Sequence, residues 1–141
     1  MEITPFTPFK LLRHSDRVVA MLAGETVYPV SVEIDLANVC NHSCPWCSFN
    51  GFRQENWVQF PEARIFSLID ELAECGVKSI TFTGGGEPLV HRVAGQVFER
   101  AHERGIQFGL VTNGRRIQNG VIDALKHAVF VRVSLEAGTA Q

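Results

Sequence analysis

Val32-Glu33-Ile34-Asp35-Leu36 is an alternating apolar and polar run, and it leads into Cys40-Asn41-His42-Ser43-Cys44-Pro45-Trp46-Cys47, where three thiols lie within eight residues. The alternation predicts a strand over residues 31–36. The C-x3-C-x2-C spacing allows three sulfur atoms to converge on one point from a single loop. Thiolates select zinc, Cu(I) or iron–sulfur clusters over hard cations. A cubane cluster needs one ligand for each of its irons, so three cysteines leave one iron open to a substrate or cofactor.

The composition is that of an ordinary globular domain, with 141 residues, 45% hydrophobic and 20% charged content, and a net charge of −2. Acids and bases are interspersed, which argues against a dedicated nucleic-acid or membrane surface. The amino-terminal residues lack the basic start and apolar core of a secretory signal, and no apolar run approaches the ~20 residues of a membrane span. Clustered thiols in such a chain predict a reducing, cytoplasmic location.

Helix and strand patterns alternate after a lead-in segment, residues 1–30, that contains one short helix within residues 9–22. Beyond the first strand, a long loop-like stretch covers residues 37–60. The apolar spacing then predicts helices at 61–75, 92–104 and 120–127, and strands at 77–82, 108–111 and 129–135. Gly76 and Gly105 are expected to end the first two of these helices. This α/β order predicts parallel strands joined by helices, in an open doubly wound sheet or an arc of a β/α barrel.

The unusual polar and glycine-rich clusters all follow predicted strands. In both candidate architectures ligands bind beyond the carboxyl ends of the strands, so these clusters predict one site on one rim. The clusters are Cys40–Cys47, Gly84–Pro88, Thr112–Gly114 and Ser134–Gly138. After Gln141 the alternation requires another helix, and we expect the sequence to be part of a longer polypeptide.

The thiol loop and the glycine-rich turn together resemble the radical S-adenosylmethionine (radical SAM) enzymes. The resemblance rests on Cys40-x3-Cys44-x-Trp46-Cys47 after the first strand and on Gly85-Gly86-Glu87 after the second. Thr112-Asn113-Gly114 and Ser134-Leu135-Glu136 support it more weakly. The resemblance covers the chain from about Val32 to its end. It implies a partial (β/α) barrel over residues 31–141, with about four of the family's six βα units.

The resemblance also implies a set of cofactor contacts. Cys40, Cys44 and Cys47 would hold three irons of a [4Fe–4S] cluster, and the fourth iron would bind the amino and carboxylate groups of S-adenosylmethionine. Glycines without Cβ atoms let the backbone approach that ligand closely. The remaining implied contacts are Gly84, Gly85 and Gly86 through the backbone, Glu87 to the methionine ammonium, Trp46 beside the adenine, and Asn113, Ser134 and Glu136 to the ribose or carboxylate.

The implied reaction is the reductive cleavage of S-adenosylmethionine to methionine and a 5′-deoxyadenosyl radical, which abstracts hydrogen from a substrate. The cofactors carry this step, while the protein orients the reactants. The implied partners are a small-molecule or peptide substrate and an electron donor such as a flavodoxin or ferredoxin. No catalytic residue and no particular substrate follow from the residues present.

Simpler interpretations of the same residues remain open. The thiols could hold zinc or a cluster in a non-catalytic structural or redox-sensing module, although His42 is spaced too tightly from Cys40 and Cys44 to complete a tetrahedron easily. The glycine-rich segment and Thr112–Gly114 could be ordinary turns. Glu33 and Asp35 could face either a barrel lumen or solvent. Cys75 is expected to be a small buried apolar residue.

Overall fold

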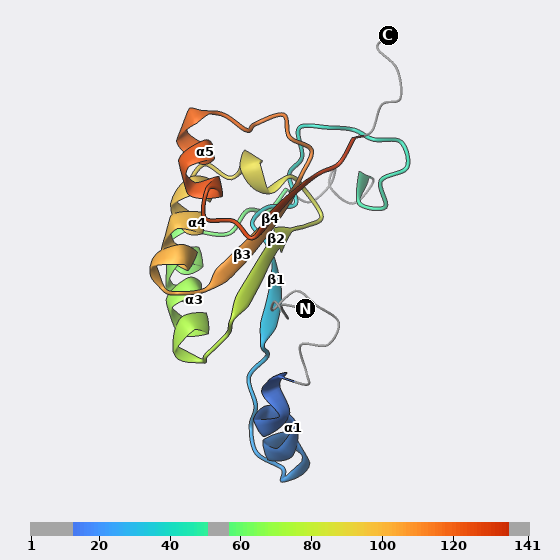
Figure 1. Ribbon diagram of the computed structural model, residues 1–141. Helices are drawn as coiled ribbons and strands as arrows, with labels where there is room; N and C mark the ends of the chain where they lie inside the picture. The colour runs from blue at the N-terminus through green and yellow to red at the C-terminus, as the bar shows by residue number, and fades with distance from the viewer. Residues whose placement is uncertain (1–12, 51–56, 136–141) are drawn as a thin grey trace.

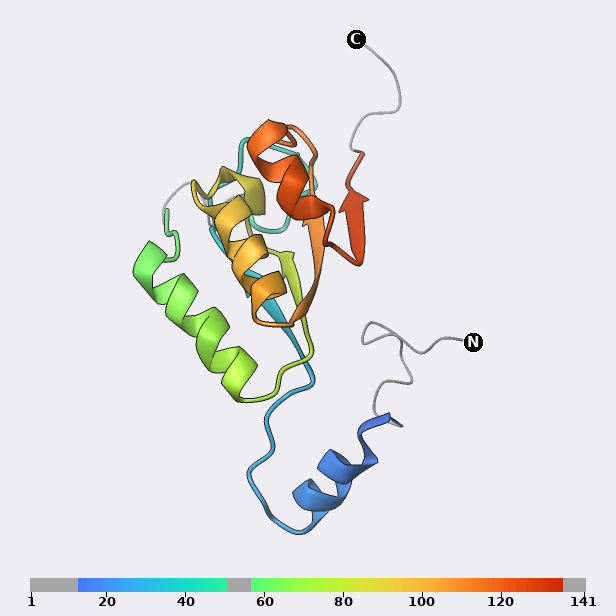
Figure 2. The ribbon, with the colours of Figure 1, turned by 60° about the vertical axis from the view of Figure 1, so that its left-hand side comes forward.

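The chain forms a four-stranded parallel sheet that is covered on one face by helices. The strands are β1 (Ser31–Asp35), β2 (Ser79–Thr83), β3 (Gln107–Thr112) and β4 (Phe130–Val133), and the helices are α1 (Ser15–Leu22), α3 (Glu62–Glu74), α4 (Ala94–Glu103) and α5 (Asn119–Leu125), with a 3₁₀ turn, η2 (Pro88–Val90). The computed structural model describes residues 13–50 and 57–135. The strand order is β1-β2-β3-β4. Figures 1 and 2 show α3, α4 and α5 on the same face of this sheet.

The predicted α/β alternation is confirmed. Every helix and strand predicted after residue 30 is present, and its ends differ from the prediction by at most two residues. In the lead-in segment α1 forms part of the predicted helix, whose expected start lies outside the described residues. The division into residues 1–30 and 31–141 stays a prediction. Two features were not predicted: η2, and an antiparallel bridge between Ala37 and Gln59 inside the loop-like stretch.

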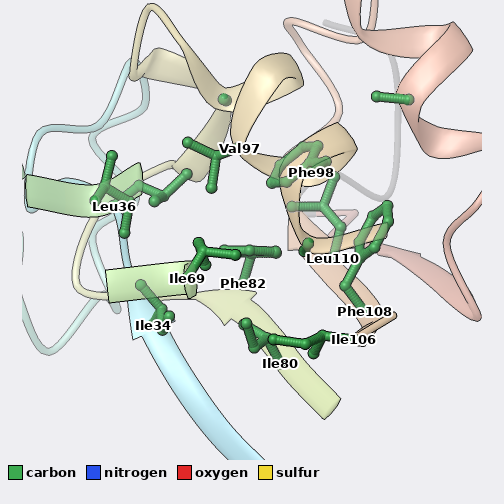
Figure 3. Packing of buried hydrophobic residues seen from close by; sticks show 14 of the residues in the cluster. Ile34, Leu36, Ile69, Ile80, Phe82, Val97, Phe98, Ile106, Phe108 and Leu110 are labelled. Carbon is green, nitrogen blue, oxygen red and sulfur yellow. The ribbon is translucent and has the colours of Figure 1, made fainter. Parts of the chain in front are cut away.

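The core lies between the sheet and its helices, as Figure 3 shows. Five apolar strand side chains that point toward the helices are at most 6% exposed; they are Ile34, Ile80, Phe82, Phe108 and Leu110. Ile65 and Ile69 of α3 meet them, because residues four apart share one helix face. The rings of Phe82, Phe98 and Phe108 form a cluster with centroid separations of 4.8 to 6.1 Å. Such aromatic contacts add to the burial of apolar area.

Glycines end two of the helices as the sequence predicted. Gly76 follows α3 with φ of +73°, and Gly105 follows α4 with φ of +72°. This left-handed conformation is costly for residues that carry a Cβ atom. Both helices therefore stop where the chain must turn back into β2 and β3.

The opposite face of the sheet carries the alternate set of strand side chains. The strand register aligns Glu33 with Thr81, Thr81 with Gly109, and Gly109 with Phe130. Side chains alternate across a strand, so these residues point away from the helices. Asp35 comes two residues after Glu33 on β1, and its side chain points to the same face. Among the described residues, no helix has the length and apolar character that crossing a bilayer requires.

An ion-pair network joins α3 to α4. Arg100 donates from Nε and Nη2 to the two carboxylate oxygens of Asp70, both at 2.9 Å, and Arg104 Nε lies 3.2 Å from Asp70 Oδ1. The pKa of Asp70 is lowered, and the main cause is the hydrogen bond from Arg100. Desolvation raises the pKa by less than this hydrogen bond lowers it, and the positive charges of Arg100 and Arg104 lower it further. This pairing favours the ionised carboxylate in the folded chain.

We predict that Asp70→Asn lowers the free energy of unfolding at neutral pH and that this deficit shrinks in acid. A carboxyl group whose pKa is lowered by folding stabilises the fold above its unfolded value, 3.8, and loses that contribution as the pH falls through the folded value. Urea unfolding of both proteins between neutral pH and about pH 2 measures the difference. Glu99→Gln, on α4 but outside this network, is the matched control. A deficit that stayed constant with pH would contradict the assignment.

Candidate functional site at the carboxyl ends of the strands

The thiol-bearing loop leaves β1 and is closed at its base by backbone hydrogen bonds. Phe60 N donates to Leu36 O at 3.0 Å, and Asn38 N donates to Val58 O at 3.1 Å. The side chain of Asn38 accepts in return from Val58 N at 2.7 Å. The imidazole Nε2 of His91, after η2, lies 2.8 Å from Phe60 O. The base of the loop is thus held by pairing of its two ends and by a contact to the segment that follows the glycine-rich turn.

Within the loop two tight turns space the three thiols. Cys47 N donates to Cys44 O, and Asn50 N donates to Cys47 O, both at 3.1 Å. His42 N lies 3.4 Å from Cys40 Sγ. All four cysteines lie in described residues, are partly buried and form no disulfide. Among the described residues, no group of three His, Cys, Asp or Glu side chains is placed to hold a single metal ion.

One cavity of about 180 Å³ brings most of the predicted site residues together. Its lining includes Cys40, Cys44, Cys47, Gly84, Gly86, Glu87, Asn113 and Ser134, together with His42, Thr83, Val111 and Thr112. These residues follow or end β1, β2, β3 and β4, so the predicted single rim is present. Two predicted residues of the described part do not line the cavity: Trp46, which is 67% exposed, and Gly85, which is buried. Glu136 lies outside the described residues.

The last glycine of the turn packs against the backbone of the thiol loop. A Cβ atom at Gly86 would lie 2.3 Å from Val39 O and 2.5 Å from Ala37 O. The next residue, Glu87, donates its N–H to Val39 O at 2.9 Å. Glycine suits this position because a Cβ atom would collide with backbone carbonyl oxygens. The glycine therefore has a packing role of its own, beside the predicted contact with S-adenosylmethionine.

Asp35 fixes the first two glycines. Its Oδ2 accepts from Gly85 N at 2.8 Å, and its Cγ would lie 2.6 Å from a Cβ atom at Gly84, whose φ is +145°. Gly84 thus adopts a conformation that favours glycine and lies directly against the carboxylate. Sequence analysis left the direction of Asp35 open. In the structure it holds the glycine-rich turn to the end of β1.

The Glu87 carboxylate is 2% exposed and joins the glycine-rich turn to the end of β3. Its Oε1 accepts from Thr112 Oγ1 at 2.6 Å and from Leu89 N at 3.1 Å, and its Oε2 accepts from Asn113 N at 2.7 Å. These three donors use most of the about four lone-pair sites of a carboxylate. The predicted contact of Glu87 with the methionine ammonium therefore has at most one site left, and it stays a prediction.

Asn113 ties β3 to the thiol loop through its side chain. Its Nδ2 donates to Asn41 Oδ1 at 2.7 Å and lies 3.9 Å from Cys40 Sγ. Arg115 N donates to Asn113 Oδ1 at 3.0 Å, while Arg115 Nη1 donates to Asn41 O at 3.3 Å. Sequence analysis singled out Asn113 but missed Asn41, because no local pattern marks a pair of amides 72 residues apart.

A parallel α/β sheet with a three-thiol loop and a glycine-rich turn at its carboxyl edge defines an α/β protein with a candidate ligand site at that edge. The family model described as "Radical SAM superfamily" matches residues 34–140. The chain belongs to the radical SAM superfamily, as the resemblance of the thiol loop implied.

Curated relatives match a similar part of the chain. A PqqA peptide cyclase of Granulibacter bethesdensis is 26% identical over 107 residues, which cover 76% of this chain and 28% of that protein. A PqqA peptide cyclase of Xanthomonas oryzae pv. oryzae is 30% identical over 111 residues, with the same two coverages. An S-adenosylmethionine-dependent nucleotide dehydratase of Selenomonas ruminantium is 27% identical over 88 residues, 62% of this chain and 31% of that protein. The chain thus spans less than a third of the length of these relatives.

Solved structures share the fold. BtrN in complex with AdoMet and 2-DOIA superposes with a TM-score of 0.67 at 19% identity, over 82% of this chain and 50% of that one. SuiB of Streptococcus suis bound to its precursor peptide SuiA gives a TM-score of 0.65 at 20% identity, over 93% and 30%. The four parallel strands and their helices are therefore arranged as in radical SAM enzymes.

We predict that Gly86→Ala destabilises the fold by roughly 1–3 kcal/mol, because its methyl group overpacks against Ala37 and Val39. The displaced thiol loop should also take up less iron during anaerobic reconstitution. Urea unfolding and iron analysis measure the two effects. The control is Gly120→Ala in α5, where an added Cβ meets no atom within 4 Å. Equal stability and iron content in the two variants would disprove the packing role.

We also predict that Glu87→Gln costs about 1–3 kcal/mol of unfolding free energy, because the new amide turns an N–H group toward at least one buried donor. Glu99→Gln, on an exposed surface of α4, serves as the control and should change stability by less than about 0.5 kcal/mol. Denaturant unfolding of both variants provides the comparison. Equal effects of the two substitutions would contradict the buried hydrogen-bond role of Glu87.

Proposed function

We propose that this chain is the cofactor-binding core of a radical SAM enzyme, with a [4Fe–4S] cluster on Cys40, Cys44 and Cys47 and S-adenosylmethionine in the adjoining cavity. The observation that carries the proposal is that the three thiols, the glycine-rich turn and Asn113 line one cavity on one rim. Membership of the radical SAM superfamily supports the same chemistry.

The residues around this cavity fit the proposed cofactors. Three thiolates on one loop suit iron, and the polar groups that line the rest of the cavity suit a charged, hydrogen-bonding ligand. When bound, the cluster and S-adenosylmethionine supply the electron and the 5′-deoxyadenosyl radical. In this proposal the backbone at Gly84 and Gly86 approaches the ligand, while Asn113 and Ser134 contribute hydrogen bonds from β3 and β4. Glu87 positions Asn113 by accepting its N–H.

The support for Trp46 and for Glu136 as cofactor contacts differs in kind. Trp46 lies on the thiol loop with most of its ring exposed, so any contact with an adenine is made from the outer rim of the cavity. Glu136 comes two residues after Ser134, which lines the cavity. This closeness in sequence is the support for proposing Glu136 as a cofactor contact. Both stay predictions that substitution and S-adenosylmethionine binding can test.

A peptide is the better supported of the two proposed substrate classes. Two of the three curated relatives described above are PqqA peptide cyclases, and one structural neighbour was solved with a precursor peptide. A small-molecule substrate remains the alternative, since another relative is a nucleotide dehydratase. The proposed reaction also requires an electron donor such as a flavodoxin or ferredoxin.

Anaerobic reconstitution of the full-length protein with iron and sulfide tests the proposal. We expect charge-transfer absorbance at about 400 nm and reductive cleavage of S-adenosylmethionine to 5′-deoxyadenosine, both lost when Cys40, Cys44 or Cys47 is replaced by Ala. Cys75→Ala is the matched control and should retain both, because Cys75 follows α3 and does not line the cavity. Stoichiometric zinc that resists exchange for iron would refute the proposal and favour a structural metal module.

A further inference from the structure

A tight turn between β3 and α5 lies at the same end of the sheet as the thiol loop, as Figures 1 and 2 show. Ile117 N donates to Gly114 O at 3.2 Å, which makes Arg115 and Arg116 the two central residues of this turn. Central residues form the tip of such a turn. Both arginines are exposed. This arginine turn, residues 114–117, therefore presents two positive charges to solvent.

Hydrogen bonds hold the arginine turn against the thiol loop. Arg115 Nη1 donates to Asn41 O at 3.3 Å, and Asn41 directly follows Cys40. Asn113, just before the turn, donates from Nδ2 to Asn41 Oδ1 at 2.7 Å. A guanidinium has five N–H donors, so the contact with Asn41 leaves most of those of Arg115 for a partner. A positive charge is thereby fixed beside the first thiol of the loop.

The charges of Arg115 and Arg116 have no counter-ion in the part of the chain that the structure describes. Neither side chain forms an ion pair there, whereas carboxylates of α3 pair with Arg64, Arg92, Arg100 and Arg104. No Asp or Glu occurs in residues 36–50 or 104–122, although the whole chain has 15 acids against 13 Lys and Arg. The rim beside the thiols is therefore locally positive on a chain of net negative charge.

The acids on neighbouring elements do not neutralise this turn. Glu87 is 2% exposed, and its carboxylate accepts from three donors. Asp35 lies at the end of β1, two strand spacings or about 10 Å from β3. Glu99 lines a hollow between α4 and α5 together with Gln118, on the helical side of the sheet. An anionic partner can thus approach the arginine turn from the rim.

We propose that Arg115 and Arg116 form a docking point for an acidic electron-carrier protein that reduces the cluster. This inference rests on the proposed function, which requires an electron donor. A carrier bound at the turn lies next to Cys40, because Arg115 contacts the adjoining residue. Carboxylates of the carrier would accept charge-assisted hydrogen bonds from the two guanidinium groups. The carrier then loses one electron and the cluster gains one, with no bond of the chain formed or broken.

A small electron carrier suits two exposed charges better than a nucleic acid does. Electron-transfer complexes have small interfaces, below about 1,200 Å² in total. Complementary charges at such an interface mainly raise the rate of encounter, which a few arginines at the right place achieve. A nucleic acid requires a longer basic stripe along one face. The net charge of −2 argues against such a stripe.

Binding of an oxidised, acidic flavodoxin to the reconstituted full-length protein tests the docking point without any electron transfer. Surface plasmon resonance measures the affinity for immobilised flavodoxin at about 0.1 M salt, where the Debye length is about 10 Å. Arg116→Gln should weaken binding about threefold, and the double variant with Arg115→Gln about tenfold. At about 1 M salt, where the Debye length is about 3 Å, all three proteins should bind alike.

Lys126→Gln is the matched control, because it removes the same charge beyond the carboxyl end of α5, about 10 Å along the helix from the turn. It should retain the wild-type affinity. Stopped-flow absorbance provides a second measurement. Reduction of the cluster by reduced flavodoxin should slow in Arg116→Gln, while reduction by the small cation of reduced methyl viologen should not. Circular dichroism and iron content verify that each variant is folded and loaded.

Three results would overturn the docking point: no binding of flavodoxin by the wild type, equal weakening by Arg116→Gln and Lys126→Gln, or a matching loss of S-adenosylmethionine affinity in Arg116→Gln. The last result would assign the arginine to the cofactor. Cluster absorbance and cleavage of S-adenosylmethionine by the same wild-type preparation test the proposed function separately. Failure of one inference is therefore distinguishable from failure of the other.

Discussion

The close approach of Gly86 to the carbonyl oxygens of Ala37 and Val39 is the constraint on which the rest of the site depends. It lets the turn after β2 lie directly against the loop after β1, with no side chain between the two backbones. Asp35 then holds the turn from one side, and Glu87 holds it from the other. The cavity exists because two loops that are distant in sequence share this contact.

The two faces of the sheet differ in composition. The face toward the helices is built from Ile34, Ile80, Phe82 and their neighbours, which are removed from water. The other face carries Glu33, Thr81 and Arg132, and these contribute little hydrophobic stabilisation. One strand can supply an apolar face and a polar face at once, because successive side chains point to opposite faces of the sheet. Substitutions of exposed residues on the polar face are thus expected to have little effect on the core.

Much of the fold and part of the site could be predicted from local patterns. Helical spacing in Ile65 and Ile69 and the glycines after α3 and α4 placed the elements correctly, since these signals act over a few residues. The rim followed from the topology of parallel strands. The hydrogen bonds of Glu87 to Thr112 and of Asn113 to Asn41 could not be predicted, because they depend on register between separate strands. The ring of Phe130 over Gly109 is another contact of this kind.

The base of the thiol loop is closed by hydrogen bonds from Asn38, Val58 and Phe60, and none of these involves sulfur. In small zinc domains the metal supplies the folding free energy, and the empty chain is unfolded. Here the base of the loop is held by backbone and amide pairing that uses no thiol. Under the proposed function, binding of iron would release thiol protons and draw the three thiols together on a loop whose two ends are already paired.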